Sequence, residues 1–114
     1  MSLTLEIKTL LASVSPYIGS MPAIPDSAVC IYATGGYKRS LSGTYLEEPT
    51  FQIKVRNTSY LTGETLCSTI KDLLHGAKTT KVLMIEQQGD MLDCGRDESN
   101  RQEWTINFRC YYRR

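Results

Sequence analysis

The sequence is poor in the residues that most often carry chemistry. It contains a single histidine, His75, and its four cysteines form no C-x-x-C pair. A zinc site needs several nitrogen or thiolate ligands, so these residues do not predict one. His75 falls in the last turn of a predicted helix, where a polar or cationic side chain interacts favourably with the helix C-terminus. The nearest cysteine, Cys67, lies eight residues away on the same helix, too far along the axis to pair with it as a nucleophile.

Long apolar runs are also missing. No stretch approaches the roughly 20 residues that a membrane-spanning helix needs, and the N-terminus lacks a charged leader followed by an apolar run and a cleavage site. We therefore expect no membrane partner and a protein that is cytosolic when made. Cysteines stay reduced in that compartment, and Cys30, Cys67 and Cys110 lie within apolar patterns typical of buried thiols.

An excess of one charge is the third absence. Thirteen basic and twelve acidic residues leave a net charge of +1, which gives no bulk attraction to nucleic acid. Gly35-Gly36 follows a strand pattern without opening a helix, so we interpret it as a turn. Four carboxylates share one segment, but their spacing differs from that of a calcium-binding loop: Asp90, Asp93, Asp97 and Glu98. The sequence therefore predicts no enzyme, no cofactor and no metal, and a protein that acts through its surface.

At 114 residues the chain is expected to form one domain, residues 1–114. Apolar residues at helical spacing predict an amphipathic helix over residues 3–14, ended by Ser15-Pro16 because the residue before proline avoids the α region. Residues 20–27 contain two prolines and predict an extended connection. The apolar run 28–33 predicts a central strand. Residues 37–48 are polar and aperiodic, and predict a long loop or a loosely held arm.

The second half of the chain has clearer patterns. Residues 51–56 alternate between apolar and polar side chains, as in a half-buried strand. Residues 57–59 predict a turn and a cap for the next helix, which ends at Gly76. The remaining elements are a short strand over residues 82–85 that can extend to Gln88, a polar loop over residues 89–100, and a strongly alternating last strand over residues 103–112.

The predicted order is therefore α-β-β-α-β-β. This order favours an α+β fold with a single mixed or antiparallel sheet of about four main strands, and two helices packed on one face. The other face of the sheet is expected to be polar, and to show Gln52, Lys54, Arg56, Asn107 and Arg109.

Several landmarks, in their order and spacing, resemble the tail terminator family of long-tailed bacteriophages, whose members are also called minor capsid proteins. The landmarks extend from about Leu5 to Tyr112. They are Gly35-Gly36, the run from Pro49 to Arg56, Tyr60 at the helix entrance, the segment from Asp97 to Glu103, and Asn107-Phe108.

The resemblance implies a non-enzymatic virion protein that caps the tail tube as a ring, expected to be a hexamer. Such a ring stops tube growth and provides the joint to the head connector. The implied partners are further copies of the chain, the tail tube protein and the connector protein. Genome DNA passes through the ring without sequence-specific binding. The implied location is the tail end at the head–tail joint, after assembly in the host cytoplasm.

The resemblance also points to candidate residues. Arg56 and Arg101 are carried over first, with Asp97 and Glu103 as ion-pair partners and Tyr60 beside them. They are candidates for the subunit interface, and the alternative is that they anchor the 89–100 loop within one subunit. The predicted arm is the second candidate, with Tyr37, Lys38, Arg39 and Tyr45 as its residues, and we hypothesise that it orders against a neighbour or the tube.

Two other functions stay open at this point. One is a different phage structural role, as a head–tail joining (neck) protein or a tail tube subunit, although tube subunits are usually longer and richer in β-structure. The other is a sheet-based module that binds single-stranded nucleic acid, which requires aromatic side chains exposed beside basic ones.

Overall fold

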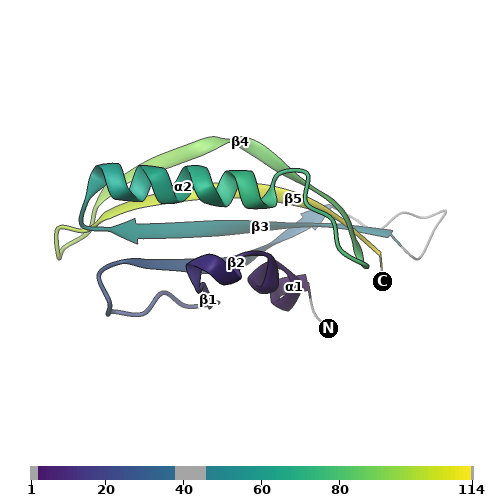
Figure 1. The fold of residues 1–114 in the computed structure, drawn as a ribbon, viewed down its shortest axis with the longest axis horizontal. Helices are drawn as coiled ribbons and strands as arrows, with labels where there is room; N and C mark the ends of the chain where they lie inside the picture. The colour runs from purple at the N-terminus through teal and green to yellow at the C-terminus, as the bar shows by residue number, and fades with distance from the viewer. Residues whose placement is uncertain (1–2, 38–45, 114) are drawn as a thin grey trace.

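The computed structural model describes residues 3–37 and 46–113 of the chain. Within them, two α-helices and a short 3-10 turn accompany a five-stranded sheet of order β1-β2-β3-β5-β4 (Figure 1). Neighbouring strands are antiparallel except β1 and β2, which run parallel. The elements are α1 (Leu3–Leu10), η1 (Ala12–Val14), β1 (Tyr17–Ile18), β2 (Ala28–Tyr37), β3 (Leu46–Asn57), α2 (Tyr60–Leu74), β4 (Val82–Arg96) and β5 (Gln102–Arg113). The predicted α+β fold is confirmed, and β1 is an addition to it.

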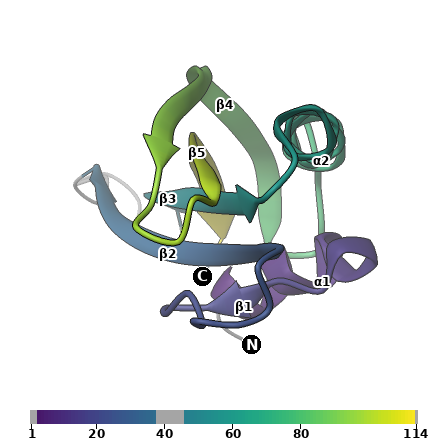
Figure 2. The same ribbon diagram turned by 90° about the vertical axis from the view of Figure 1, so that its left-hand side faces the viewer.

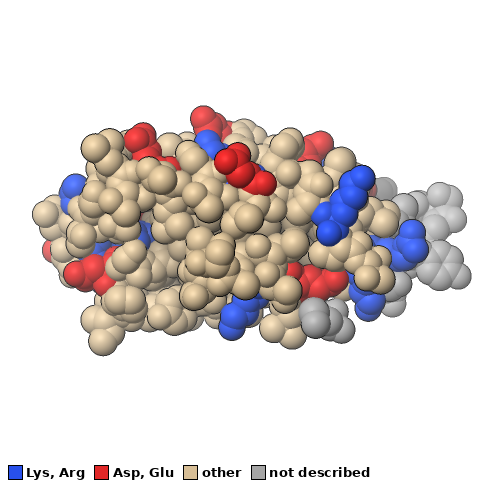
Figure 3. Space-filling model, viewed as in Figure 1, with Lys and Arg blue, Asp and Glu red and all other residues tan. Residues whose placement is uncertain are grey.

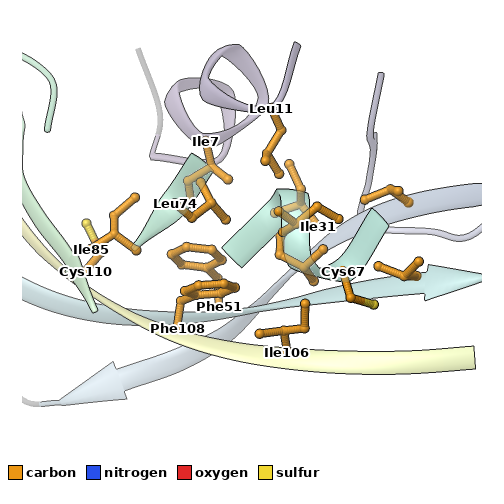
Figure 4. Close-up of a cluster of buried hydrophobic side chains, with 14 of the residues drawn as sticks. Ile7, Leu11, Ile31, Phe51, Cys67, Leu74, Ile85, Ile106, Phe108 and Cys110 are labelled. Carbon is orange, nitrogen blue, oxygen red and sulfur yellow. The ribbon is translucent and has the colours of Figure 1, made fainter. Parts of the chain in front are cut away.

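Both helices cover the same face of the sheet, and the core lies between the two layers (Figures 2 and 4). Alternation along β5 places Trp104 and Phe108 on this face, fully buried. The ring of Phe108 stacks on that of Phe51 with centroids 5.2 Å apart. Ile7 of α1 and Leu74 of α2 point into the same cluster. Each large apolar side chain buried here contributes roughly 1.5–3 kcal/mol, so this layer holds the fold together.

Helix α2 begins and ends where the sequence predicts. The side chain of Ser59 accepts a hydrogen bond from the N–H of Thr62 at 3.3 Å, which caps the first turn. Gly76 follows the last turn with a φ of +78°, a conformation that favours glycine. Within the helix, Gly63 has no side chain, which allows the ring of Trp104 to lie directly against the helix backbone. Neither described helix is long and apolar enough to span a membrane.

The first helix is shorter than predicted. Helix α1 ends at Leu10, and the chain continues as the 3-10 turn η1, in which the N–H of Val14 donates to the carbonyl of Leu11 at 2.9 Å. The tighter turn changes the chain direction, and Tyr17 and Ile18 then pair with β2. The prediction was wrong beyond Leu10 because apolar spacing does not distinguish a last α-helical turn from a 3-10 turn.

The segment 89–100 is not the predicted loop. Strand β4 continues through most of it and pairs with β5, so only a short turn joins the two strands. Between the register pairs at Gln88 and Leu92, β4 advances by four residues while β5 advances by two. This bulge contains Gly89, whose φ is +75°. The prediction was wrong because the extra residues break the period of two by which a strand is recognised.

Gly35 and Gly36 form a bulge inside β2, and the predicted turn at the end of that strand is wrong. The register between β2 and β3 shifts between Ala33 and Gly36. A Cβ added at Gly36 would lie 2.6 Å from the carbonyl oxygen of Glu48. Glycine therefore permits the close approach of the two strands at the point where the register changes.

As a result, the predicted arm over residues 37–48 is shorter. Tyr37 belongs to β2, and β3 already begins at Leu46. The pairing of both strands across the bulge continues them beyond the point where their apolar patterns end. The other predicted arm residues, Lys38, Arg39 and Tyr45, lie outside the described residues.

Candidate interaction surfaces

Four of the five residues predicted for an interface or loop anchor take part in one set of side-chain hydrogen bonds at one end of the molecule. At this end β3 stops, α2 starts, and the β4–β5 turn lies near the connection that follows β1 (Figure 1). We call the residues whose side-chain hydrogen bonds join these segments the end network. Its members are Arg56, Tyr60, Asp93, Asp97, Arg101 and Gln102.

Arg56 is the buried member of the end network. Its side chain donates to the carbonyl oxygens of Pro25, at 2.6 Å, and Asp26, at 3.2 Å. The next residue, Asn57, donates to the hydroxyl of Ser27 at 3.0 Å. The residue Arg56 is only 3% exposed, so its charge depends on these carbonyl oxygens for compensation. Arg56 thus fixes the end of the 20–27 connection against β3, and does not reach the 89–100 segment.

Asp97 and Arg101 organise the β4–β5 turn. One carboxylate oxygen of Asp97 accepts the N–H groups of Ser99 and Arg101, both at 2.9 Å, and the other pairs with the guanidinium of Arg101 at 2.8 Å. The backbone and side chain of Arg101 hold the pKa of Asp97 below its usual value. Arg101 also donates to the carbonyl of Ala23 at 2.6 Å and lies 3.6 Å from the carboxylate of Asp26. The Arg101–Asp97 ion pair therefore joins the turn to the same connection that Arg56 holds.

Tyr60 joins the start of α2 to β4. Its hydroxyl donates to a carboxylate oxygen of Asp93 at 3.0 Å, and its ring meets that of Trp104 edge-on, with centroids 5.2 Å apart. The other oxygen of Asp93 accepts the N–H of Gly95 at 2.8 Å and the side-chain amide of Gln102. The Gly95 N–H and the Tyr60 hydroxyl lower the pKa of Asp93, and the same hydrogen bond raises the pKa of Tyr60.

Neither Asp93 nor Gln102 was named from the sequence as a candidate interface or anchoring residue, although Gln102 lies within the Asp97 to Glu103 landmark. Asp93 fell in a segment predicted to be a loop, where a carboxylate is expected to be solvated. Gln102 precedes the alternating run of the last strand, yet it is buried. The one available signal was the pair of amide side chains, Asn57 and Gln102, at facing strand ends, which is visible only once the register of β3 and β5 is known.

Glu103 lies directly opposite Arg56 in the register of β3 and β5, and its side chain lies on the sheet face opposite the helices. Its carboxylate pairs with Lys54 at 3.4 Å. On the same face, Gln52 donates to Asn107 at 3.1 Å, and Arg109 pairs with a carboxylate of β3, that of Glu48. This open face is polar, as predicted, but Arg56, which was expected to be exposed on it, is buried against the 20–27 connection. The cations Lys54 and Arg109 have carboxylate partners within the sheet.

A groove runs between α1 and β1, at the edge of the sheet that β1 forms. Its volume is about 740 Å³, and most of its lining is apolar. Three apolar side chains are well exposed beside it: Leu5 at 47%, and Tyr17 and Ile18 at 41% each. Among the described residues of its lining, Lys8 carries the one charged side chain. We call this surface the α1–β1 groove.

The outer face of α2 is a second surface that lies uncovered within the described part of the chain. Figure 3 views the molecule from the side on which α2 lies and shows sparse charges over a broad area. Leu61, 73% exposed, is the most exposed residue of this helix among the large apolar ones. Small hydroxyl residues follow it at helical spacing, namely Thr65, Ser68 and Thr69. A helix face of this composition leaves the backbone accessible to close packing.

The histidine and the buried cysteines are the side chains most able to carry chemistry, and each lies in surroundings that suit a structural role instead. The ring nitrogen Nδ1 of His75 accepts the N–H of Gln87 at 3.1 Å, which ties the end of α2 to β4. Burial raises the pKa of the Cys67 and Cys110 thiols to about 12, so both stay protonated and are poor nucleophiles. Across residues 3–37 and 46–113, no cluster of His, Cys, Asp or Glu could hold a metal ion.

Comparison with known proteins gives one family and one fold. A family model described as bacteriophage tail terminator protein matches residues 4–114. A chain in the solved virion of a native gene transfer agent particle has a similar fold, with a TM-score of 0.63 and 12% sequence identity. The match covers 95% of this chain and 84% of that one. At this identity the likeness establishes the fold alone. No curated protein matches the sequence.

Proposed function

Because the chain belongs to the bacteriophage tail terminator protein family, whose members are structural proteins of the virion, we propose that it caps the phage tail tube as a ring. The ring stops tube growth and provides the joint to the head connector. We expect a hexamer, built from residues 1–114 acting as one domain, that performs no catalysis. Genome DNA passes through its hole without sequence-specific binding.

The observation that carries this proposal is the family match over residues 4–114. The surface of the fold is compatible with it. A ring forms through a heterologous contact, in which one surface of each subunit meets a different surface of the next. The α1–β1 groove and the outer face of α2 are two such different surfaces. The open sheet face is a third surface for the tube or the connector.

The end network suits a docking platform more than a contact between subunits. Arg56 is buried and uses its hydrogen bonds within its own chain. Tyr60, Asp97 and Arg101 likewise bind partners in the same chain. We propose that these residues anchor the 20–27 connection and the β4–β5 turn, which together present a fixed shape at one end of the molecule. A rigid end of this kind serves docking because less conformational entropy is lost on binding.

The open sheet face offers little support for the alternative of a nucleic-acid-binding module. Such a module needs cations available to phosphates beside exposed aromatic rings. Lys54 and Arg109 already pair with Glu103 and Glu48, and Arg109 also lies over the ring of Tyr111 at 5.2 Å. Binding a phosphate strand here would break these pairs.

The experiment that tests the proposed function follows tube growth. The tail tube protein of the same phage is allowed to polymerise, the purified chain is added at different times, and tube lengths are measured by electron microscopy. The proposal predicts that growth stops at the moment of addition and that one end of each tube carries extra density.

Two outcomes would redirect the assignment. Unchanged tube lengths together with binding to the purified head connector would indicate a neck protein that joins finished heads and tails. Unchanged lengths together with salt-sensitive retention on single-stranded DNA would indicate the nucleic-acid-binding module. The matched control is an equal concentration of chain denatured by heat, which should leave growth unaffected in every case.

A further inference from the structure

We propose that neighbouring subunits of the ring contact each other by placing the outer face of α2 of one copy in the α1–β1 groove of the next. This inference rests on the proposed ring and names the two surfaces that build it. The occupant of the groove is a second copy of this chain, and the contact is head-to-tail.

The groove has the features of a site that receives a helix. It is bounded by one helix and one short edge strand, and Leu5, Tyr17 and Ile18 expose apolar surface beside it. An amphipathic or weakly polar helix lies in a groove of this kind by presenting side chains at helical spacing. The volume of about 740 Å³ accommodates several side chains from one face of a helix.

The outer face of α2 has the complementary shape. Leu61 projects at the start of the helix, 73% exposed, and can fill apolar space in the groove. Thr65, Ser68 and Thr69 follow on the same side. Their short side chains let the helix backbone approach the walls of the groove, and their hydroxyls tolerate a partly hydrated contact.

Charge complementarity supports this pairing. Lys8 is the charged side chain of the groove lining, and Glu64 lies one turn after Leu61 on α2. Within the described residues, neither Lys8 nor Glu64 forms an ion pair. By contrast, the carboxylate of Asp90 close to the bulge of β4 is already held by Lys71 at 3.0 Å. Lys8 and Glu64 are therefore a cation and an anion that the described part of the fold leaves available on two different surfaces.

The two surfaces cannot satisfy each other within one molecule. Helix α1 packs near the end of α2, since Ile7 and Leu74 share the core cluster. Leu61 is thirteen residues before Leu74, which corresponds to roughly 20 Å along the helix axis. The anion at the start of α2 is thus far from the cation on α1 of the same chain. A neighbouring copy, rotated about a ring axis, is the partner that brings them together.

The test is a charge exchange between two variants, read as the mass of the assembly by light scattering over a range of concentrations, with and without purified tail tubes. Lys8→Glu and Glu64→Lys each place like charges in every contact. We expect each variant alone to need at least about a tenfold higher concentration to assemble.

An equimolar mixture of the two variants should restore assembly. In a ring where they alternate, one contact joins the new carboxylate at position 8 to the new ammonium at position 64. The next contact joins the original Lys8 of one variant to the original Glu64 of the other. Every contact is then complementary again, so assembly should return close to the wild-type concentration.

Matched controls separate this pairing from a general effect of charge. Lys78→Glu and Glu98→Lys make the same charge changes at exposed positions outside both surfaces, and they should assemble like the wild type. Thermal melting of each variant should remain close to that of the wild type, which establishes that loss of assembly is not loss of fold.

Three results would overturn the inference. Single variants that assemble normally, a mixture that does not recover, or control variants that fail equally would each show that this pairing does not build the ring, while leaving the capping proposal intact. A wild-type chain that remains monomeric and ignores tube ends would instead remove the proposed function itself, and the inference with it.

Discussion

The substitution Gly63→Ala tests how closely α2 packs on the sheet. An alanine within a helix is usually more favourable than glycine, by roughly 1 kcal/mol. A Cβ at this position, however, would overlap the outer ring of Trp104, a side chain that is fully buried. The two groups must separate by more than about 1 Å to reach an ordinary contact of roughly 3.5–4 Å. Either the helix or the indole has to move.

The structure predicts that the overlap outweighs the helix propensity. Overpacking a core costs about 1–3 kcal/mol, and we take the upper end because Trp104 is buried and also held edge-on by Tyr60. Subtracting the propensity gain leaves a net loss of about 2 kcal/mol in the free energy of unfolding. For a chain of this size the melting temperature should fall by roughly 8 °C.

The assay is chemical and thermal unfolding followed by circular dichroism, with two comparisons. Thr65→Ala is the matched control on the exposed side of the same helix, and it should be neutral or slightly stabilising. In a Trp104→Phe background the smaller ring removes the overlap, so Gly63→Ala should cost less than in the wild type. A Gly63→Ala variant that melts above the wild type would refute the close packing described here.

Three further predictions follow from the buried and polar groups. Arg56→Met should lower the free energy of unfolding by about 2–3 kcal/mol, since two hydrogen bonds from a buried charge are lost. Hydrogen exchange should also rise in residues 20–27, and unchanged exchange there would contradict the anchoring role of Arg56. The pKa of Asp93 is lowered in the folded protein, so its ionised form stabilises the fold above the usual aspartate pKa of about 4. This stabilisation is lost as the pH falls through the lower pKa of the folded state. The free energy of unfolding, measured with urea at pH 7 and pH 3, should therefore change less with pH in Asp93→Asn than in the wild type. An equal change in both proteins would contradict this role of Asp93. Cys94 is exposed and should react with a thiol reagent in the folded protein, whereas Cys67 and Cys110 should react only after unfolding.

The layered architecture could be predicted from the sequence because its signals are local. The alternation from Trp104 to Tyr112 identifies β5 and its buried face, and the structure buries each apolar residue of that series. The hydroxyl of Ser59 and the glycine at position 76 mark the limits of α2 for equally local reasons, a cap and a positive φ.

The bulges could not be predicted in the same way. Gly35-Gly36 and Gly89 interrupt the period of two, and each was interpreted as the end of a strand or the start of a loop. A bulge is defined by the register between two strands, and that information is distributed over segments far apart in the sequence, such as Gly36 and Pro49.

The candidate residues could likewise be predicted from the sequence only in part. Arg56, Tyr60, Asp97 and Arg101 were named together from the resemblance to the family, and the fold brings them to one end of the molecule. Glu103 lies on the open face and pairs with Lys54. Their partners were missed where the contact crosses elements, because a carbonyl acceptor in the 20–27 connection has no sequence signature.

We propose that this chain closes the tail tube as a ring, and the mass of the particle that it forms tests this proposal. Light scattering after gel filtration should be measured across protein concentrations and with purified tail tubes added. We expect a closed assembly with six times the mass of the chain, or tight retention at tube ends. A monomer at every concentration that also leaves tube ends bare would contradict it.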